Sequence, residues 1–89
     1  MVRVFVRHTV EDFARWRQAY DGMEALRQAG GVQAQGVFQA LDDPNDVTIW
    51  HDFETRDKAE AFITSEALGA ALAEAGVTGE PIAWLTQPA

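Results

Sequence analysis

The sequence contains no cysteine among its 89 residues, which excludes disulfides, thiolate zinc sites and cysteine nucleophiles. Positive charge is also scarce, since seven Lys and Arg stand against fourteen Asp and Glu, a formal net charge of −7. This balance disfavours binding to nucleic-acid phosphates and to anionic membranes. The chain has no apolar run of about 18 residues, and its start does not resemble a signal peptide. We therefore expect a cytoplasmic protein with neither nucleic-acid nor membrane partners.

The chain is nevertheless rich in residues that form a core. Hydrophobic residues make up 47% of it, including three Trp and five Phe. A length of 89 residues predicts a single domain that spans residues 1–89. A domain this small buries only a modest core, so covering a second apolar surface with a partner adds much to its stability.

Two kinds of periodicity divide the chain into six elements. Apolar residues alternate, as in strands, over residues 2–8, 31–41, 47–53 and 82–86. They recur every three or four residues, as in helices, over residues 10–26 and 59–75. Between the two middle strands, residues 43–46 read Asp-Pro-Asn-Asp. This is strong turn chemistry, because Pro presets φ while Asp and Asn bond their own backbone. The predicted order is β-α-β-β-α-β with a central hairpin.

The ends of the two helices carry recognisable signals. Thr9 is the expected N-cap of the first helix, and Asp12 stands where a capping box usually has Glu. Thr55 is the expected N-cap of the second helix, and Ser65 is expected to cap it again after a kink. Gly76 is expected to end this helix in the left-handed conformation.

These elements predict an α+β, ferredoxin-like fold. Two split β-α-β units with right-handed crossovers give a four-stranded antiparallel sheet of order 4-1-3-2, with both helices on one face. Asp43 is expected to pair with Asp46 across the turn, because this register joins the apolar rows of the two middle strands on the face that the helices cover. It places Ala40 opposite Ile49, Phe38 opposite His51, and Gly36 opposite Phe53.

The other face of the sheet mixes aromatic with polar side chains. Phe5, Val37 and Trp50 are expected there, with Arg7 placed to hold a carboxylate across a subunit interface. Large apolar patches on small domains usually have partners, so we expect a homodimer formed by this face. The alternative is an ordinary exposed sheet with Arg7 as surface charge. Trp84 fits either face.

Three segments resemble a known family. Residues 8–16 read HTVEDFARW and are followed by Tyr20-Asp21, which resembles the first strand and helix of dimeric α+β-barrel proteins such as the antibiotic-biosynthesis monooxygenase-like family. Residues 42–47 and 75–81 resemble small stand-alone members that are often labelled cyclase. The resemblance covers nearly the whole chain, and its motifs mark the fold more than the chemistry.

The resemblance implies a homodimer whose two sheets pack face to face, with a pocket between the sheet and the helices of each subunit. Some members of this family oxygenate or cyclise aromatic polyketides without metal or flavin, and others degrade haem. The haem degraders need Asn, Trp and His in the pocket. Asn45 is the only Asn here and lies in the central turn, which disfavours haem degradation and is also a departure from many cofactor-free oxygenases.

Two histidines are the candidates for catalysis. His51 lies in mid-strand on a row of apolar residues and is the first candidate for a general base, with a pKa tuned by burial. The alternative is a structural histidine that hydrogen-bonds Tyr20 or a water. His8 ends the first strand and is the weaker candidate. Antiparallel pairing puts His8 near Val47 and His51 near Val4, about 13 Å apart along the strand, which is too far for a two-histidine metal site.

We expect a ligand pocket with no metal and no cofactor, open to a small aromatic or polyketide-like molecule. The resemblance implies a cofactor-independent monooxygenase or cyclase, which His51 among small and aromatic residues supports, and the alternative is a non-catalytic ligand-binding or accessory protein of the same fold. Trp16 and Tyr20 also fit a core role, because helical spacing alone accounts for them. The residues expected to contact the ligand are Gly36, Phe38, Phe53, Trp16, Tyr20 and Phe62.

Overall fold

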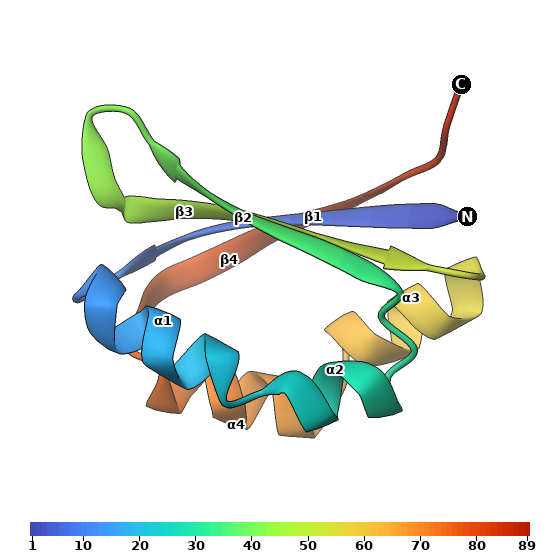
Figure 1. Ribbon diagram of the computed structural model, residues 1–89, viewed down its shortest axis with the longest axis horizontal. Helices are drawn as coiled ribbons and strands as arrows, with labels where there is room; N and C mark the ends of the chain where they lie inside the picture. Colours follow the sequence, from blue (N-terminus) through green and yellow to red (C-terminus); the bar gives the residue numbers. More distant parts are fainter.

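The computed structural model describes all residues, 1–89, and has one antiparallel sheet covered on one face by helices (Figure 1). The strand order is β2-β3-β1-β4, so the predicted ferredoxin-like topology is confirmed. Each of the two expected helices is divided into two shorter ones. The elements are β1 (Val2–Val10), α1 (Phe13–Asp21), α2 (Glu24–Ala29), β2 (Ala34–Ala40), β3 (Asp43–Phe53), α3 (Arg56–Ile63), α4 (Glu66–Glu74) and β4 (Val77–Thr86).

The central pair of strands has the expected register. β1 and β3 place Val4 opposite His51 and His8 opposite Val47, as predicted. Because side chains alternate along a strand, both histidines point to the helix-covered face together with the valines of β1. No helix has the length and apolarity that a membrane span requires.

The register between β2 and β3 differs from the prediction. Ala40 pairs with Asp43, so the chain reverses at residues 41–42 rather than 43–46. The register shifts beside Ala40, and beyond this bulge Gly36 lies opposite Trp50 and Phe38 opposite Thr48. Up to Gln39 the predicted register is out by three residues, an odd number, so the side chains of β2 before the bulge change face.

The Asp-Pro-Asn segment has another role than the one predicted. Asp43 Oδ1 accepts a hydrogen bond of 2.9 Å from the Asn45 backbone, which bends β3 locally instead of reversing the chain. Asn45 Oδ1 in turn accepts a bond of 3.0 Å from the backbone N–H of Phe13, the first residue of α1. Thr9 is still within β1, so its predicted role as N-cap is wrong, and Asn45 caps this helix from a distant strand.

The signals of the second helical segment are confirmed. The side chain of Thr55 accepts a hydrogen bond from the Lys58 backbone, and that of Ser65 accepts one from Leu68. Gly76 has a φ of 84°, the left-handed conformation expected at the end of α4.

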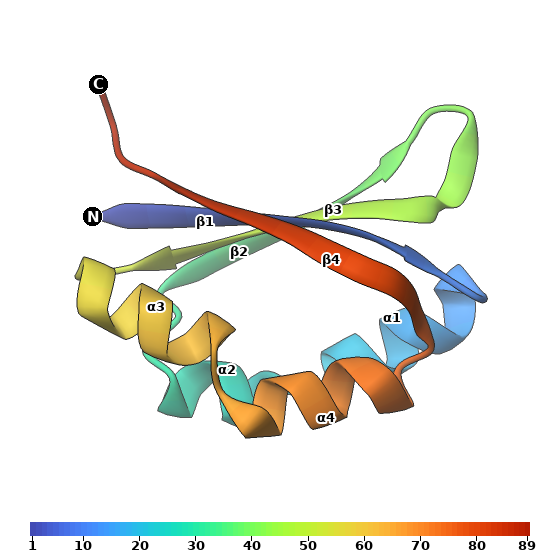
Figure 2. The same ribbon diagram turned by 180° about the vertical axis from the view of Figure 1, so that it is seen from behind.

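The core lies between the sheet and the helices in two clusters. One gathers around Trp16, Tyr20 and Ile49, under α1 and the start of β4. The other gathers around Val4, Phe53 and Phe62, under α3. Viewed from behind, α4 runs below β4, and α2 and α3 lie toward the same end of the helical layer (Figure 2).

Candidate functional site

A small cavity lies between the two core clusters. Its volume is about 30 Å³, enough for one water molecule. The sheet forms its floor, and side chains of α1–α4 and of the break before α2 form its walls. Most of the lining is aliphatic or aromatic, and the lining residues are Val6, His8, Tyr20, Met23, Leu26, Arg27, Ile49, His51, Phe62, Ile63, Leu68 and Leu72.

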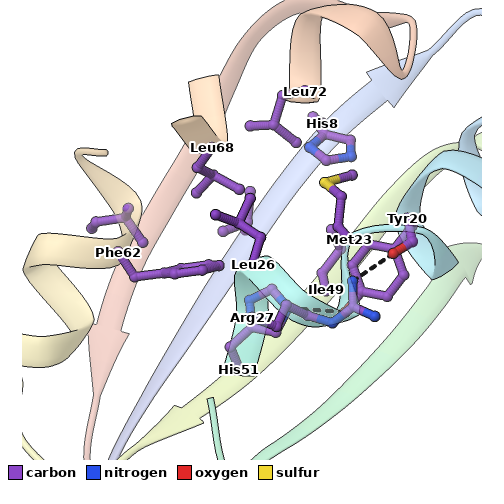
Figure 3. A pocket seen from close by; sticks show the side chains of 12 residues that line it. His8, Tyr20, Met23, Leu26, Arg27, Ile49, His51, Phe62, Leu68 and Leu72 are labelled. Carbon is purple, nitrogen blue, oxygen red and sulfur yellow. Dashed lines mark hydrogen bonds between the residues drawn. The ribbon is translucent and has the colours of Figure 1, made fainter. Parts of the chain in front are cut away.

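His51 and Tyr20 form a hydrogen-bonded pair at one end of this lining (Figure 3). The Tyr20 hydroxyl lies 2.9 Å from His51 Nε2, and both side chains are buried. Burial, with the nearby Arg27 charge, lowers the pKa of His51 to about 4, so its imidazole is neutral at pH 7. Burial also raises the pKa of Tyr20, which keeps its hydroxyl protonated. His51 thus makes the hydrogen bond to Tyr20 that a structural histidine was expected to make. This bond is also compatible with a role of His51 as a base.

Arg27 of α2 is the charged group of the cavity, and sequence reasoning missed it. Its side chain is buried and lies over the Tyr20 ring, 4.1 Å from the ring centroid. One guanidinium nitrogen donates to the Tyr20 carbonyl oxygen, whereas the buried Nε has no partner. No carboxylate pairs with it, although burying a cation without a counter-ion is costly. Arg27 is therefore a buried cation whose charge no carboxylate of the chain neutralises.

His8 lines the cavity at the end away from His51 (Figure 3). Both of its ring nitrogens are buried without a hydrogen bond, as is Nε1 of Trp16, whose ring packs edge-on against it at 5.6 Å. Burial lowers the pKa of His8, which favours the neutral ring. Unpaired buried groups of this kind usually have a water or ligand as their partner.

Four of the six predicted ligand contacts lie elsewhere. Gly36 and Phe38 point away from the helices because the register of β2 differs from the prediction. Trp16 and Phe53 are fully buried core residues that do not line the cavity. These four residues therefore do not line this cavity, and their contact with a ligand stays a prediction.

The helix-free face of the sheet carries most of the residues predicted for it. Phe5 stacks on Trp84 with ring centroids 5.5 Å apart, which assigns Trp84 to this face. Arg3 lies over the Trp50 ring at 3.9 Å, and Arg7 forms an ion pair with Asp46. Val37 is the exception, because it lies opposite Ile49 and packs into the core under α1. Its predicted place on this face is wrong.

The fold has close counterparts among solved structures. One antibiotic biosynthesis monooxygenase aligns with a TM-score of 0.77 at 15% identity, over 100% of this chain and 99% of the other. SnoaB, a cofactor-independent oxygenase from Streptomyces nogalater, aligns with a TM-score of 0.75 at 14% identity, over 99% and 94% of the two chains. Rv0793 from Mycobacterium tuberculosis aligns with a TM-score of 0.72 at 16% identity, over 99% of this chain and 94% of the other.

The chain has the fold of the antibiotic biosynthesis monooxygenases. At the level of sequence, no protein-family model and no curated protein matches it. TM-scores of 0.72–0.77 establish the fold, whereas identities of 14–16% leave the activity to be argued from the cavity itself.

Proposed function

We propose that this protein is a cofactor-independent monooxygenase for an aromatic substrate that carries an acidic hydroxyl or an acidic C–H next to a carbonyl. One observation carries the proposal: the buried guanidinium of Arg27, free of any carboxylate, lies beside the neutral Tyr20–His51 pair in an otherwise apolar cavity. Apolar walls suit an aromatic body, and the cation suits the oxyanion that forms when such a substrate loses a proton.

The chemistry requires one base and one oxyanion partner. His51 takes the proton of the substrate, directly or through the Tyr20 hydroxyl, and Arg27 holds the resulting enolate or phenolate oxygen. An electron-rich carbanion of this kind reacts with dioxygen by itself to give a hydroperoxide. Loss of water from the hydroperoxide leaves a carbonyl, so one CH₂ and one O₂ give one C=O and one H₂O. The same proton removal would serve the cyclase alternative.

The comparison with SnoaB supports this direction, because that protein is described as a cofactor-independent oxygenase and has the same fold. The support concerns the scaffold, since the identity is 14%. The residues proposed here come from this chain alone, and Asn45, its only Asn, is at the α1 cap rather than in the cavity.

A non-catalytic ligand-binding or accessory role is the second candidate. The cavity of about 30 Å³ holds one water rather than an aromatic ring, and the Tyr20–His51 bond already satisfies His51. The enzyme therefore needs the helices or the side chains of the wall to move when the substrate enters.

Oxygen uptake separates the two candidates. Anthrone, a three-ring ketone with an acidic CH₂, is supplied as substrate, and dioxygen consumption is followed together with anthraquinone formation. We expect one O₂ per anthraquinone with the unmodified protein, and rates lower by about 10² in Arg27→Met and His51→Gln. Arg56→Met, which removes an exposed arginine of α3, is the matched control and should react normally.

Two results would favour other conclusions. Saturable anthrone binding without oxygen uptake would support the ligand-binding role. Uptake that survives both cavity substitutions would contradict the site proposed here.

We also propose that the protein acts as a homodimer through the helix-free face of its sheet. Exposed apolar side chains gather there, with Trp84 43%, Phe38 61% and Ile82 63% accessible. The β2–β3 hairpin and the C-terminal end both rise on this side of the sheet, where a second copy would lie between them (Figure 1). Arg3–Asp52 and Arg7–Asp46 ion pairs flank the aromatic residues and would form a polar rim.

A further inference from the structure

A surface groove of about 480 Å³ lies directly beside the cavity. It runs between α2 and the α3–α4 segment, at the end of the helical layer where α2 and α3 both lie (Figure 2). Two residues, Leu26 and Phe62, line both spaces. The other groove residues are mostly small, and the lining consists of Leu26, Ala29, Gly30, Gly31, Lys58, Ala61, Phe62, Ser65 and Ala67.

Phe62 lies across the boundary between the groove and the cavity. Its ring is buried, packs edge-on against His51 at 5.6 Å and covers Gly30. A Cβ at Gly30 would overlap this ring, so glycine at this position is what lets the ring lie there. The ring thus separates the groove from the Tyr20–His51 pair.

Both boundary residues belong to short helical segments next to breaks. Leu26 lies in α2, a helix of only six residues that follows the break after α1. Gly30 caps the C-terminal end of this helix, and Gly31 follows in the left-handed conformation. Phe62 is in the last turn of α3, directly before the break that Ser65 caps. Short segments between breaks open at lower cost than the middle of a long helix.

We propose that groove and cavity are two parts of one ligand site, divided in the free protein by Phe62 and Leu26. Its ligand is an aromatic molecule of two or more rings with one acidic group at its end. The acidic end passes Phe62 and reaches Arg27, while the ring system stays in the groove between α2 and α3. The volume of the groove falls in the range of ordinary small-molecule sites, whereas that of the cavity alone does not. The assignment of the inner end to Arg27 rests on the proposed function; the groove and its boundary do not.

The probe for this site is 8-anilinonaphthalene-1-sulfonate, a multi-ring aromatic anion whose fluorescence rises on binding. Ala61→Trp fills the groove from an exposed position on α3. We expect it to weaken binding about tenfold or more, since little of the ligand would then fit. Ala70→Trp, at an exposed position of α4 outside both linings, is the matched control and should bind like the unmodified protein.

The boundary is tested by the rate of association. Gly30→Ala displaces the Phe62 ring. It should speed association about tenfold, because a smaller fraction of the molecules then has the ring between groove and cavity. Gly69→Ala is its control, because a Cβ there meets nothing within 4 Å. Near-ultraviolet circular dichroism confirms that each variant is folded, and amide shifts of Gly30, Ala61 and Phe62 in NMR spectra locate the probe.

The outcomes distinguish this proposal from the proposed function. Unchanged affinity in Ala61→Trp, unchanged rates in Gly30→Ala, or shifts confined to the helix-free face of the sheet would overturn the shared site. Weaker binding in Ala61→Trp without any effect of Arg27→Met would keep the groove and remove the anion site on which the proposed function rests. The reverse pattern would keep Arg27 and remove the groove.

Discussion

Four polar side chains lie buried at the cavity: His8, Tyr20, Arg27 and His51. Tyr20 and His51 satisfy each other, whereas His8 and the Nε of Arg27 have no partner. An unpaired buried polar group costs about 1–3 kcal/mol, so a stable core does not gain from keeping them. Their retention in one place is more consistent with binding chemistry than with packing.

Histidine burial predicts a stability that falls in mild acid. The unfolded chain protonates His51 with the ordinary pKa of 6.5, but burial keeps its folded pKa at about 4. Between these values the unfolded state binds more protons, so the free energy of unfolding decreases as the pH falls, by about 2–3 kcal/mol in total. Urea denaturation at pH 7, 5.5 and 4.5 measures this decrease.

His51→Gln is the control for that titration. It should flatten the profile in this window, leaving the smaller part due to His8, whose pKa burial also lowers. Arg3 and Arg7 lower the pKa of Asp52 and Asp46, so these ion pairs lose stability mainly toward the acid end of this window, where the unfolded carboxylates take up protons; His51→Gln retains that loss and separates it from the histidine titration. A wild-type stability independent of pH between 6.5 and 4 would mean that His51 is not buried as described.

The Tyr20 hydroxyl has a measurable structural value. Tyr20→Phe keeps the packed ring but leaves His51 Nε2 without its partner, and should lower the free energy of unfolding by about 1–2 kcal/mol. A double-mutant cycle with His51→Gln isolates the pair, and the two losses should not add. Full additivity would show that the bond does not form in solution.

At the scale of elements, the sequence predicted correctly those helix ends and strand pairings that depend on local sequence signals. The caps at Thr55 and Ser65, the left-handed Gly76 and the β1–β3 register were all predictable, because each depends on neighbours in sequence or on long apolar alternation. The turn was misplaced because Asp43 and Asn45 do make the expected backbone bond, but inside a strand. That error moved the residues of β2 before the bulge, Ala34–Gln39, to the other face.

The candidate site was predictable only in part, for the same reason. His51, His8, Tyr20 and Phe62 followed from apolar periodicity and do line the cavity. Arg27 was missed because arginine is usually exposed, although it lies seven residues after Tyr20 and thus on the same helical stripe. The signal that could have identified Arg27 is a charged residue on an otherwise apolar helical stripe.

The long-range cap of α1 gives a prediction for an element. Asn45→Ala removes the acceptor for the Phe13 N–H and should cost about 1 kcal/mol of stability. Asp12→Ala is the matched control, because Asp12 occupies the N-cap position without a side-chain bond and its loss should change little. Thermal unfolding of both variants compares them; equal effects would leave α1 without the cap assigned to Asn45.

At the scale of the whole molecule, the proposed dimer predicts the effect of a charge on the helix-free face. Trp84→Glu replaces an exposed ring that stacks on Phe5, so the fold of a single chain should tolerate it. In a dimer the carboxylate would be desolvated without a partner, which favours dissociation. Light scattering at micromolar concentration should give a dimer for the unmodified chain and a monomer for the variant.

Glu66→Gln, on the exposed surface of α4, is the control and should stay dimeric. An unmodified chain that is monomeric at this concentration would refute the dimer regardless of the variant.

The whole molecule carries a formal charge of −7, yet its cavity presents an unpaired cation, and this contrast is what the proposed function depends on. The absorbance of bound 4-nitrophenol tests it directly, because phenol and phenolate have different spectra. A guanidinium within contact distance should lower the pKa of the bound phenol by about one unit or more relative to free solution. In Arg27→Met the bound phenol should show an unchanged or raised pKa. A phenol that binds the unmodified protein in the cavity with no fall in its pKa would contradict the role assigned to Arg27, and with it the oxyanion site.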